Sequence, residues 1–157
     1  MKQLENKVAV VTGVGSGIGK AISLAFAKEG ASLGIGDIND SFLSKTNDEI
    51  KQDTQNVIAL NTDVSSEDQV KKLIDDTVNA YGKLDVIVNN VSVAIGGYPI
   101  TDMSNQDWQK ILAINFSSVF YGCKHSIPYL KKNNGGSIIN IASVQAHTPL
   151  PGWAAYA

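Results

Sequence analysis

The sequence predicts an α/β fold, a doubly wound parallel sheet of about five strands with helices on both faces. Short apolar runs alternate with longer amphipathic stretches along the 157 residues, as expected for repeated strand–helix–strand units. The apolar runs carry few polar residues, which is typical of parallel strands buried on both faces. Right-handed crossovers between such strands produce the doubly wound arrangement.

Five apolar runs are the expected strands. They are residues 8–11, 33–37, 57–60, 86–88 and 138–141. Gly34 and Gly36 weaken the second run, because glycine contributes no side chain to the packing of a sheet.

Four helices are expected between these strands, over residues 18–29, 40–52, 65–81 and about 105–131. Asp40 or Ser41 can cap the second helix, and Ser65 begins the third. Gly82 stops the third helix. Pro128 is expected to break the fourth helix near its end.

Composition and charge exclude several classes of protein. Hydrophobic residues make up 43% and charged residues 18% of the chain, as in soluble globular proteins, so we expect one domain over residues 1–157. The net charge is −2, and no basic stripe suits nucleic acid. No apolar run is long enough to cross a membrane. The single cysteine, Cys123, fits a reducing cytoplasm, where we expect the protein to reside.

A glycine-rich turn separates the first strand from the first helix. Such a turn lets the backbone approach a pyrophosphate, and the start of the helix supplies free N–H groups and a partial positive charge. The alternative is a tight turn that binds nothing. The pattern predicts a dinucleotide site formed by Gly13, Ser16, Gly17, Ile18 and Gly19.

Asp37 supports this interpretation and favours NAD over NADP. It ends the second strand, 18 residues after Gly19, where an acidic side chain can accept hydrogen bonds from the adenosine ribose. Its charge would repel a 2′-phosphate, and the chain has no arginine to bind one. The alternative is that Asp37 only caps the next turn.

Residues 12–19 read T-G-x-x-x-G-I-G, and with the later motifs they resemble the classical short-chain dehydrogenases/reductases. The resemblance implies an NAD(P)-binding Rossmann domain. It places Asp63 and Val64 against the adenine ring and Asn90 beside the cofactor.

The same resemblance implies an NAD-dependent oxidoreductase that interconverts a small secondary alcohol and a ketone. Ser143 and Tyr156, 13 residues apart, match the family's catalytic serine and tyrosine, and Asn115 matches its catalytic asparagine. Ser143 would hold the substrate oxygen, Tyr156 would act as general acid or base, and Asn115 would support a proton relay. The alternatives are that Ser143 is a turn hydroxyl, that Tyr156 is a surface aromatic residue and that Asn115 is a structural amide.

Two features depart from the family. Val91 and Ser92 stand where the family has Ala-Gly, and a side chain at Ser92 is expected to weaken cofactor binding. The family's lysine four residues after Tyr156, and its later strands and helices, are not in the sequence. We therefore expect a C-terminally incomplete, truncated domain with weak NAD binding and little or no turnover. A noncatalytic dinucleotide-binding module, a nonfunctional fragment, and an epimerase or dehydratase of the same superfamily are the alternatives.

The helix over residues 105–131 is apolar nearly all round, which predicts burial on more than one side. The resemblance implies that it packs against its copy in a second subunit, so we expect a homo-oligomer for the full-length form. Cys123 fits a core position better than a nucleophile. His125 and His147 have neither metal-ligand spacing nor an acidic partner nearby in the sequence, so we expect no metal site.

Overall fold

The computed structural model describes residues 2–157 as one five-stranded parallel sheet. The strands lie in the order β3-β2-β1-β4-β5. Their bounds are β1 Val8–Thr12, β2 Ser32–Asp37, β3 Val57–Asn61, β4 Val86–Asn89 and β5 Ser137–Asn140. The predicted doubly wound α/β fold is therefore confirmed, with each strand within one residue of its expected bounds.

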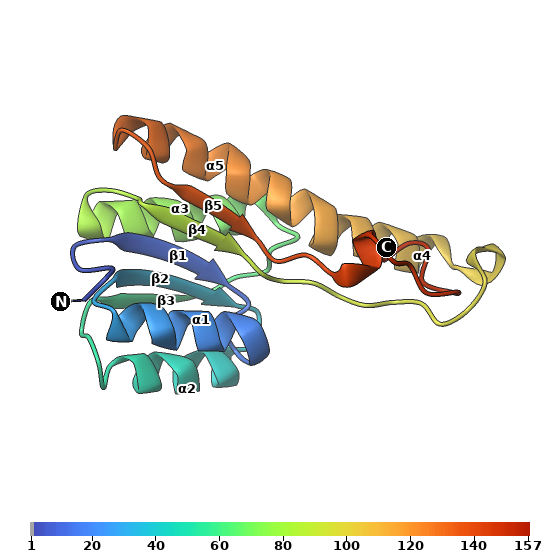
Figure 1. Ribbon diagram of the computed structural model, residues 1–157, viewed down its shortest axis with the longest axis horizontal. Helices are drawn as coiled ribbons and strands as arrows, with labels where there is room; N and C mark the ends of the chain where they lie inside the picture. Colours follow the sequence, from blue (N-terminus) through green and yellow to red (C-terminus); the bar gives the residue numbers. More distant parts are fainter. Residues whose placement is uncertain (1) are drawn as a thin grey trace.

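Helices cover both faces of the sheet. Their bounds are α1 Gly17–Lys28, α2 Asp40–Ile50, α3 Glu67–Tyr81, α4 Asn105–Ile111 and α5 Ser118–Lys132. Helices α1 and α2 lie on one face, and α3 and α5 lie on the other (Figure 1). Helix α5 and the segments around α4 extend past the carboxyl ends of the strands (Figure 1).

The core consists of two apolar layers that share the central strands. Strand β1 is buried at every position, and its side chains alternate between the two layers. Val11 packs with Leu33 and Ile35 in the α1–α2 layer. Val10 packs with Leu73 in the α3–α5 layer. Strands β1, β2 and β4 are thus mostly buried, whereas β5, at the edge of the sheet, is largely exposed.

The fourth helix differs from its prediction. Pro128 does not break it, because α5 continues to Lys132, and one missing N–H donor is tolerated in a helix that packs along its length. The irregularity lies earlier, where Leu112–Ser117 is π-helical. Phe116 and Phe120 are 73% and 55% exposed on this chain, so the second burial surface remains a prediction.

Two helix starts differ from their predictions. The side chain of Asn39, and not that of Asp40 or Ser41, caps α2 by accepting the Phe42 N–H at 3.1 Å. Helix α3 begins at Glu67, two residues after Ser65. Local hydrogen bonds decide such starts, and several neighbouring polar residues can compete to make them.

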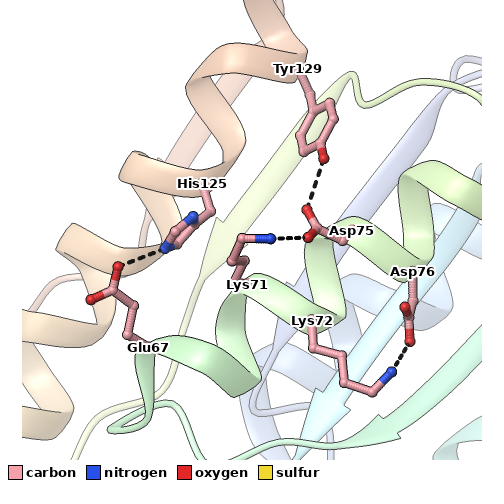
Figure 2. Close-up of polar contacts among 7 residues, drawn as sticks. All are labelled: Glu67, Lys71, Lys72, Asp75, Asp76, His125 and Tyr129. Carbon is pink, nitrogen blue, oxygen red and sulfur yellow. Dashed lines mark hydrogen bonds and ion pairs between the residues drawn. The ribbon is translucent and has the colours of Figure 1, made fainter.

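Polar pairs join α3 to α5 (Figure 2). His125 Nε2 lies 2.9 Å from Glu67 Oε1, and the Tyr129 hydroxyl donates to Asp75 Oδ1 at 2.8 Å. Burial alone would raise the pKa of Asp75, but hydrogen bonds from Lys71 and Tyr129 hold it below its ordinary value. The acidic partner of His125 is thus 58 residues away in the sequence. A local sequence pattern does not reveal a partner at that separation.

Candidate dinucleotide and catalytic site

A cavity of about 710 Å³ lies at the carboxyl ends of the strands. Most of the predicted site residues line it: Gly13, Ser16, Gly17, Ile18, Asp37, Asn90, Asn115, Ser143 and Tyr156. Gly19, Asp63 and Val64 do not line it. In an open α/β sheet this end is where ligands bind.

The glycine-rich turn is shaped by close contacts and by left-handed backbone. Gly13 and Gly17 have φ angles of 70° and 57°, which side chains disfavour. A Cβ atom at Gly19 would lie 2.2 Å from the Gly13 carbonyl oxygen, so Gly19 lets α1 pack directly on the turn. The first turn of α1 carries no acidic residue, and its partial positive charge is not neutralised from within the helix.

Asp37 lines the cavity directly beside this turn. Its Oδ2 accepts the Gly15 N–H at 2.8 Å, and its Oδ1 accepts the Asn39 N–H at 2.9 Å. The carboxylate is therefore fixed in place, and it keeps lone pairs for further donors. Within residues 2–157 no ammonium group pairs with it. The ligand and turn-capping interpretations of Asp37 are both compatible with this geometry.

Asn90 clamps the turn to the end of β1. Its Nδ2 donates to the carbonyl oxygens of Thr12 and Gly13, at 3.0 and 3.1 Å. Its backbone N–H donates to Thr12 Oγ1 at 3.2 Å. Val91 and Ser92, which follow it directly, also line the cavity.

Asp63 and Val64 have local roles. Asp63 Oδ1 accepts the N–H and the hydroxyl of Ser65, at 2.9 and 2.7 Å. Val64 is buried in the α3–α5 layer. Their contact with an adenine ring stays a prediction.

The three residues predicted to be catalytic all line the cavity. Asn115 lies in the π-helical stretch, accepts the Val93 N–H at 2.8 Å and donates to the Val93 carbonyl at 2.9 Å. It therefore makes the structural bonds of the alternative interpretation. Ser143 Oγ accepts the Gln145 N–H at 3.2 Å, and Tyr156 is half-buried.

Asn140 is a cavity residue that the sequence reasoning missed. Its Oδ1 accepts from Asn89 Nδ2 at 2.9 Å, so an amide pair joins the ends of β4 and β5. Gly122 makes room for this pair, because a Cβ there would lie 2.0 Å from Asn89 Oδ1. The available signal was a polar residue inside the apolar run 138–141.

In the described chain, residues 2–157, no group of three or more His, Cys, Asp or Glu side chains could hold a metal ion. No helix in that same range has the length and apolar character needed to cross a membrane.

Known proteins resemble this chain over nearly its whole length. A family profile described as short chain dehydrogenase matches residues 7–157. A 3-oxoacyl-[acyl-carrier-protein] reductase of Thermotoga maritima is 36% identical over 99% of this chain and 63% of its own length. A 3beta-hydroxysteroid dehydrogenase of Eggerthella lenta is 34% identical over 98% of this chain and 59% of its own length.

Solved structures give the same result. A xylitol dehydrogenase bound to NAD+ has a TM-score of 0.93 and 31% identity, over 99% of this chain and 60% of that one. A short chain dehydrogenase/reductase from Burkholderia phymatum in complex with NAD has a TM-score of 0.93 and 34% identity, over 99% and 56%. The chain thus spans about 60% of the length of such relatives.

Proposed function

The chain belongs to the short chain dehydrogenase family, and on that premise we propose that it binds NAD and carries the catalytic residues of an oxidoreductase. The reaction is the interconversion of a small secondary alcohol and a ketone. The observation that carries the proposal is a single cavity lined by Gly17 and Asp37 and also by Ser143 and Tyr156. A dinucleotide and a small substrate need such adjoining regions.

The residues at the glycine-rich turn fit a dinucleotide. Gly17 has no atom within 4 Å of where its Cβ would stand, so the backbone at the start of α1 is open to a diphosphate. Asp37 is held by two N–H groups and can accept the hydroxyls of an adenosine ribose. Its unpaired negative charge favours NAD over NADP, because a 2′-phosphate would be repelled.

The side chains of Ser143, Tyr156 and Asn115 supply the hydrogen-bonding and proton-transfer groups of the proposed reaction. When bound, the nicotinamide accepts or supplies the hydride. The Ser143 hydroxyl donates a hydrogen bond to the substrate oxygen, and the Tyr156 hydroxyl passes a proton to or from that oxygen. Asn115, which lines the cavity, fixes the backbone at Val93, next to the cavity residue Ser92, and supports the relay of that proton.

The relatives differ in the substrates for which they are named. The relatives are named for a 3-oxoacyl-[acyl-carrier-protein], a hydroxysteroid and glucose, and these have in common a carbinol or carbonyl carbon. We propose a small-molecule substrate, a cytoplasmic location and a homo-oligomeric full-length form, the last because Phe116 and Phe120 present an apolar surface on α5 and the stretch before it.

NADH and NADPH titrations of the purified chain, followed by nucleotide fluorescence, test the proposal. We expect NADH to bind more tightly than NADPH and Asp37→Ala to weaken NADH binding by about tenfold or more, because it removes a charge-assisted hydrogen bond. Asp53→Ala removes an exposed carboxylate elsewhere and serves as the control. Absence of NADH binding by the wild-type chain would refute the proposal.

Hydride transfer separates the enzymatic role from a noncatalytic one. With a panel of secondary alcohols and NAD+, formation of NADH that is lost in Tyr156→Phe supports the oxidoreductase. Binding without transfer to any substrate supports a dinucleotide-binding module. Conversion of a sugar nucleotide without net NADH supports an epimerase.

A further inference from the structure

Two segments beyond the sheet are joined through glycines. The segment after β4 and the segment after β5 both run past the strand ends (Figure 1). The Gly97 N–H donates to the Gly152 carbonyl at 2.9 Å. Gly152 has a φ of 82°, and a Cβ on it would lie 2.9 Å from the Tyr98 nitrogen. Only glycine fits at this crossing, so the two segments are built to touch there.

The indole of Trp153 occupies the space that Gly96 leaves. A Cβ on Gly96 would lie 2.9 Å from Trp153 Cε3 and 3.2 Å from its Cδ2. The indole also meets the ring of Tyr156, with centroids 6.1 Å apart and planes at 73°. This edge-to-face arrangement is a favoured geometry for aromatic pairs. The Tyr156 N–H also donates to the Trp153 carbonyl at 2.9 Å.

We propose that Trp153 is a positioning residue that holds the Tyr156 ring at the cavity. Trp153 does not itself line the cavity, so it acts through Tyr156. The segment it packs against is held at Val93 by the Asn115 side-chain amide, whose oxygen accepts the Val93 N–H and whose nitrogen donates to the Val93 carbonyl. Asn115, the segment after β4, Trp153 and Tyr156 therefore form one connected unit, and a proton donor must be held in a narrow range of positions to react.

The positioning role of Trp153 rests on the proposed function, but the contact between the Trp153 and Tyr156 rings can be tested without a nucleotide. In the full chain labelled with ¹³C-tyrosine, the Tyr156 ring signals are assigned by their loss in Tyr156→Phe. We expect the indole to displace these signals from those of an exposed tyrosine. Trp153→Leu should abolish the displacement, and Trp153→Phe should restore part of it, because a ring remains. Trp108→Phe, on α4, is the control and should change nothing.

The positioning role is tested by adding NADH to the same samples. We expect NADH to perturb the Tyr156 signals in the wild type. In Trp153→Leu this perturbation should be lost, while NADH affinity stays within about twofold, since the dinucleotide contacts lie elsewhere. Gly96→Ala displaces the indole without deleting it and should give the same loss, which guards against a folding defect of Trp153→Leu.

Each outcome decides between the two proposals. If Tyr156 responds identically in Trp153→Leu and in the wild type, the positioning role is wrong, even when NADH binds. If the wild type fails to bind NADH, the proposed function is wrong. In that case unaltered Tyr156 ring signals in Trp153→Leu would also overturn the aromatic contact.

Discussion

The two ends of the sheet use the same kinds of polar side chain in opposite ways. At the amino ends, Asp85 is buried and accepts the Val8 N–H at 2.9 Å, together with Lys7, Lys83 and Asn133 at 3.0 to 3.3 Å. At the carboxyl ends, Asp37 accepts only two backbone N–H groups and faces a cavity.

This contrast separates stability from binding. The carboxylate of Asp85 has its partners within the chain, so its interactions stabilise the folded state. The carboxylate of Asp37 keeps capacity for a ligand, because an acceptor that is only partly satisfied can still bind a donor. The three predictions that follow are ways to break or sharpen this division.

Asp85→Ala should have the largest effect on stability. Removing the centre of this buried network leaves the Val8 N–H without its acceptor and two lysines without their counterion, so we expect the free energy of unfolding to fall by about 3 kcal/mol. Urea denaturation measures it. Asp37→Ala is the matched variant at the other end, with an expected loss of only about 1 kcal/mol. Equal losses in the two variants would contradict the division.

Gly19→Ala should have the next largest effect, and it tests whether the carboxyl end also has a rigid part. The new Cβ would collide with the Gly13 carbonyl, and overpacking against backbone is expected to cost about 2 kcal/mol in the free energy of unfolding. NADH binding should fall as well, because the turn must shift. Gly82→Ala is the control: it has a φ of 79° and open space around it, so only a left-handed strain of about 1 kcal/mol is expected. A Gly19→Ala chain that binds NADH normally would show that the close contact is dispensable.

The smallest expected effect is a change in acid sensitivity. Burial alone would raise the pKa of Asp85, but the Val8 N–H and the two lysines outweigh burial and hold it below its ordinary value. The ionised carboxylate therefore stabilises the folded state above the unfolded pKa of about 3.9, and this stabilisation is lost as the pH falls through the lowered folded pKa. The free energy of unfolding should thus decline on acidification.

Asp85→Asn tests this assignment, because it removes the titrating group and keeps an acceptor for the Val8 N–H. Its unfolding free energy should decline less steeply than that of the wild type below about pH 4. Asp75 and Glu67, whose pKa values are also lowered, keep part of the slope in both proteins. A steeper decline of the unfolding free energy on acidification in Asp85→Asn than in the wild type would contradict this assignment.

Local patterns explain which parts of the fold could be predicted. The apolar runs of β1 and β4 need no distant information to indicate buried strands, and Gly82 ends α3 in the left-handed conformation expected of a C-terminal glycine. The cap of α2 could not be assigned, because Asn39, Asp40 and Ser41 all offer suitable oxygens. The π-helical stretch at Leu112–Ser117 has no local signal that separates it from a regular helix.

The sequence by itself determined the strand–helix order, the glycine-rich turn and the identity of the polar residues that follow the strands, because each of these depends on neighbours a few positions apart. Only the tertiary structure decided that Asn140 pairs with Asn89, that Glu67 faces His125, and that Gly96 and Gly152 seat Trp153 against Tyr156. Such contacts join residues that the chain brings together after its core has packed. Their energies depend on distances and directions in space that no local spacing encodes.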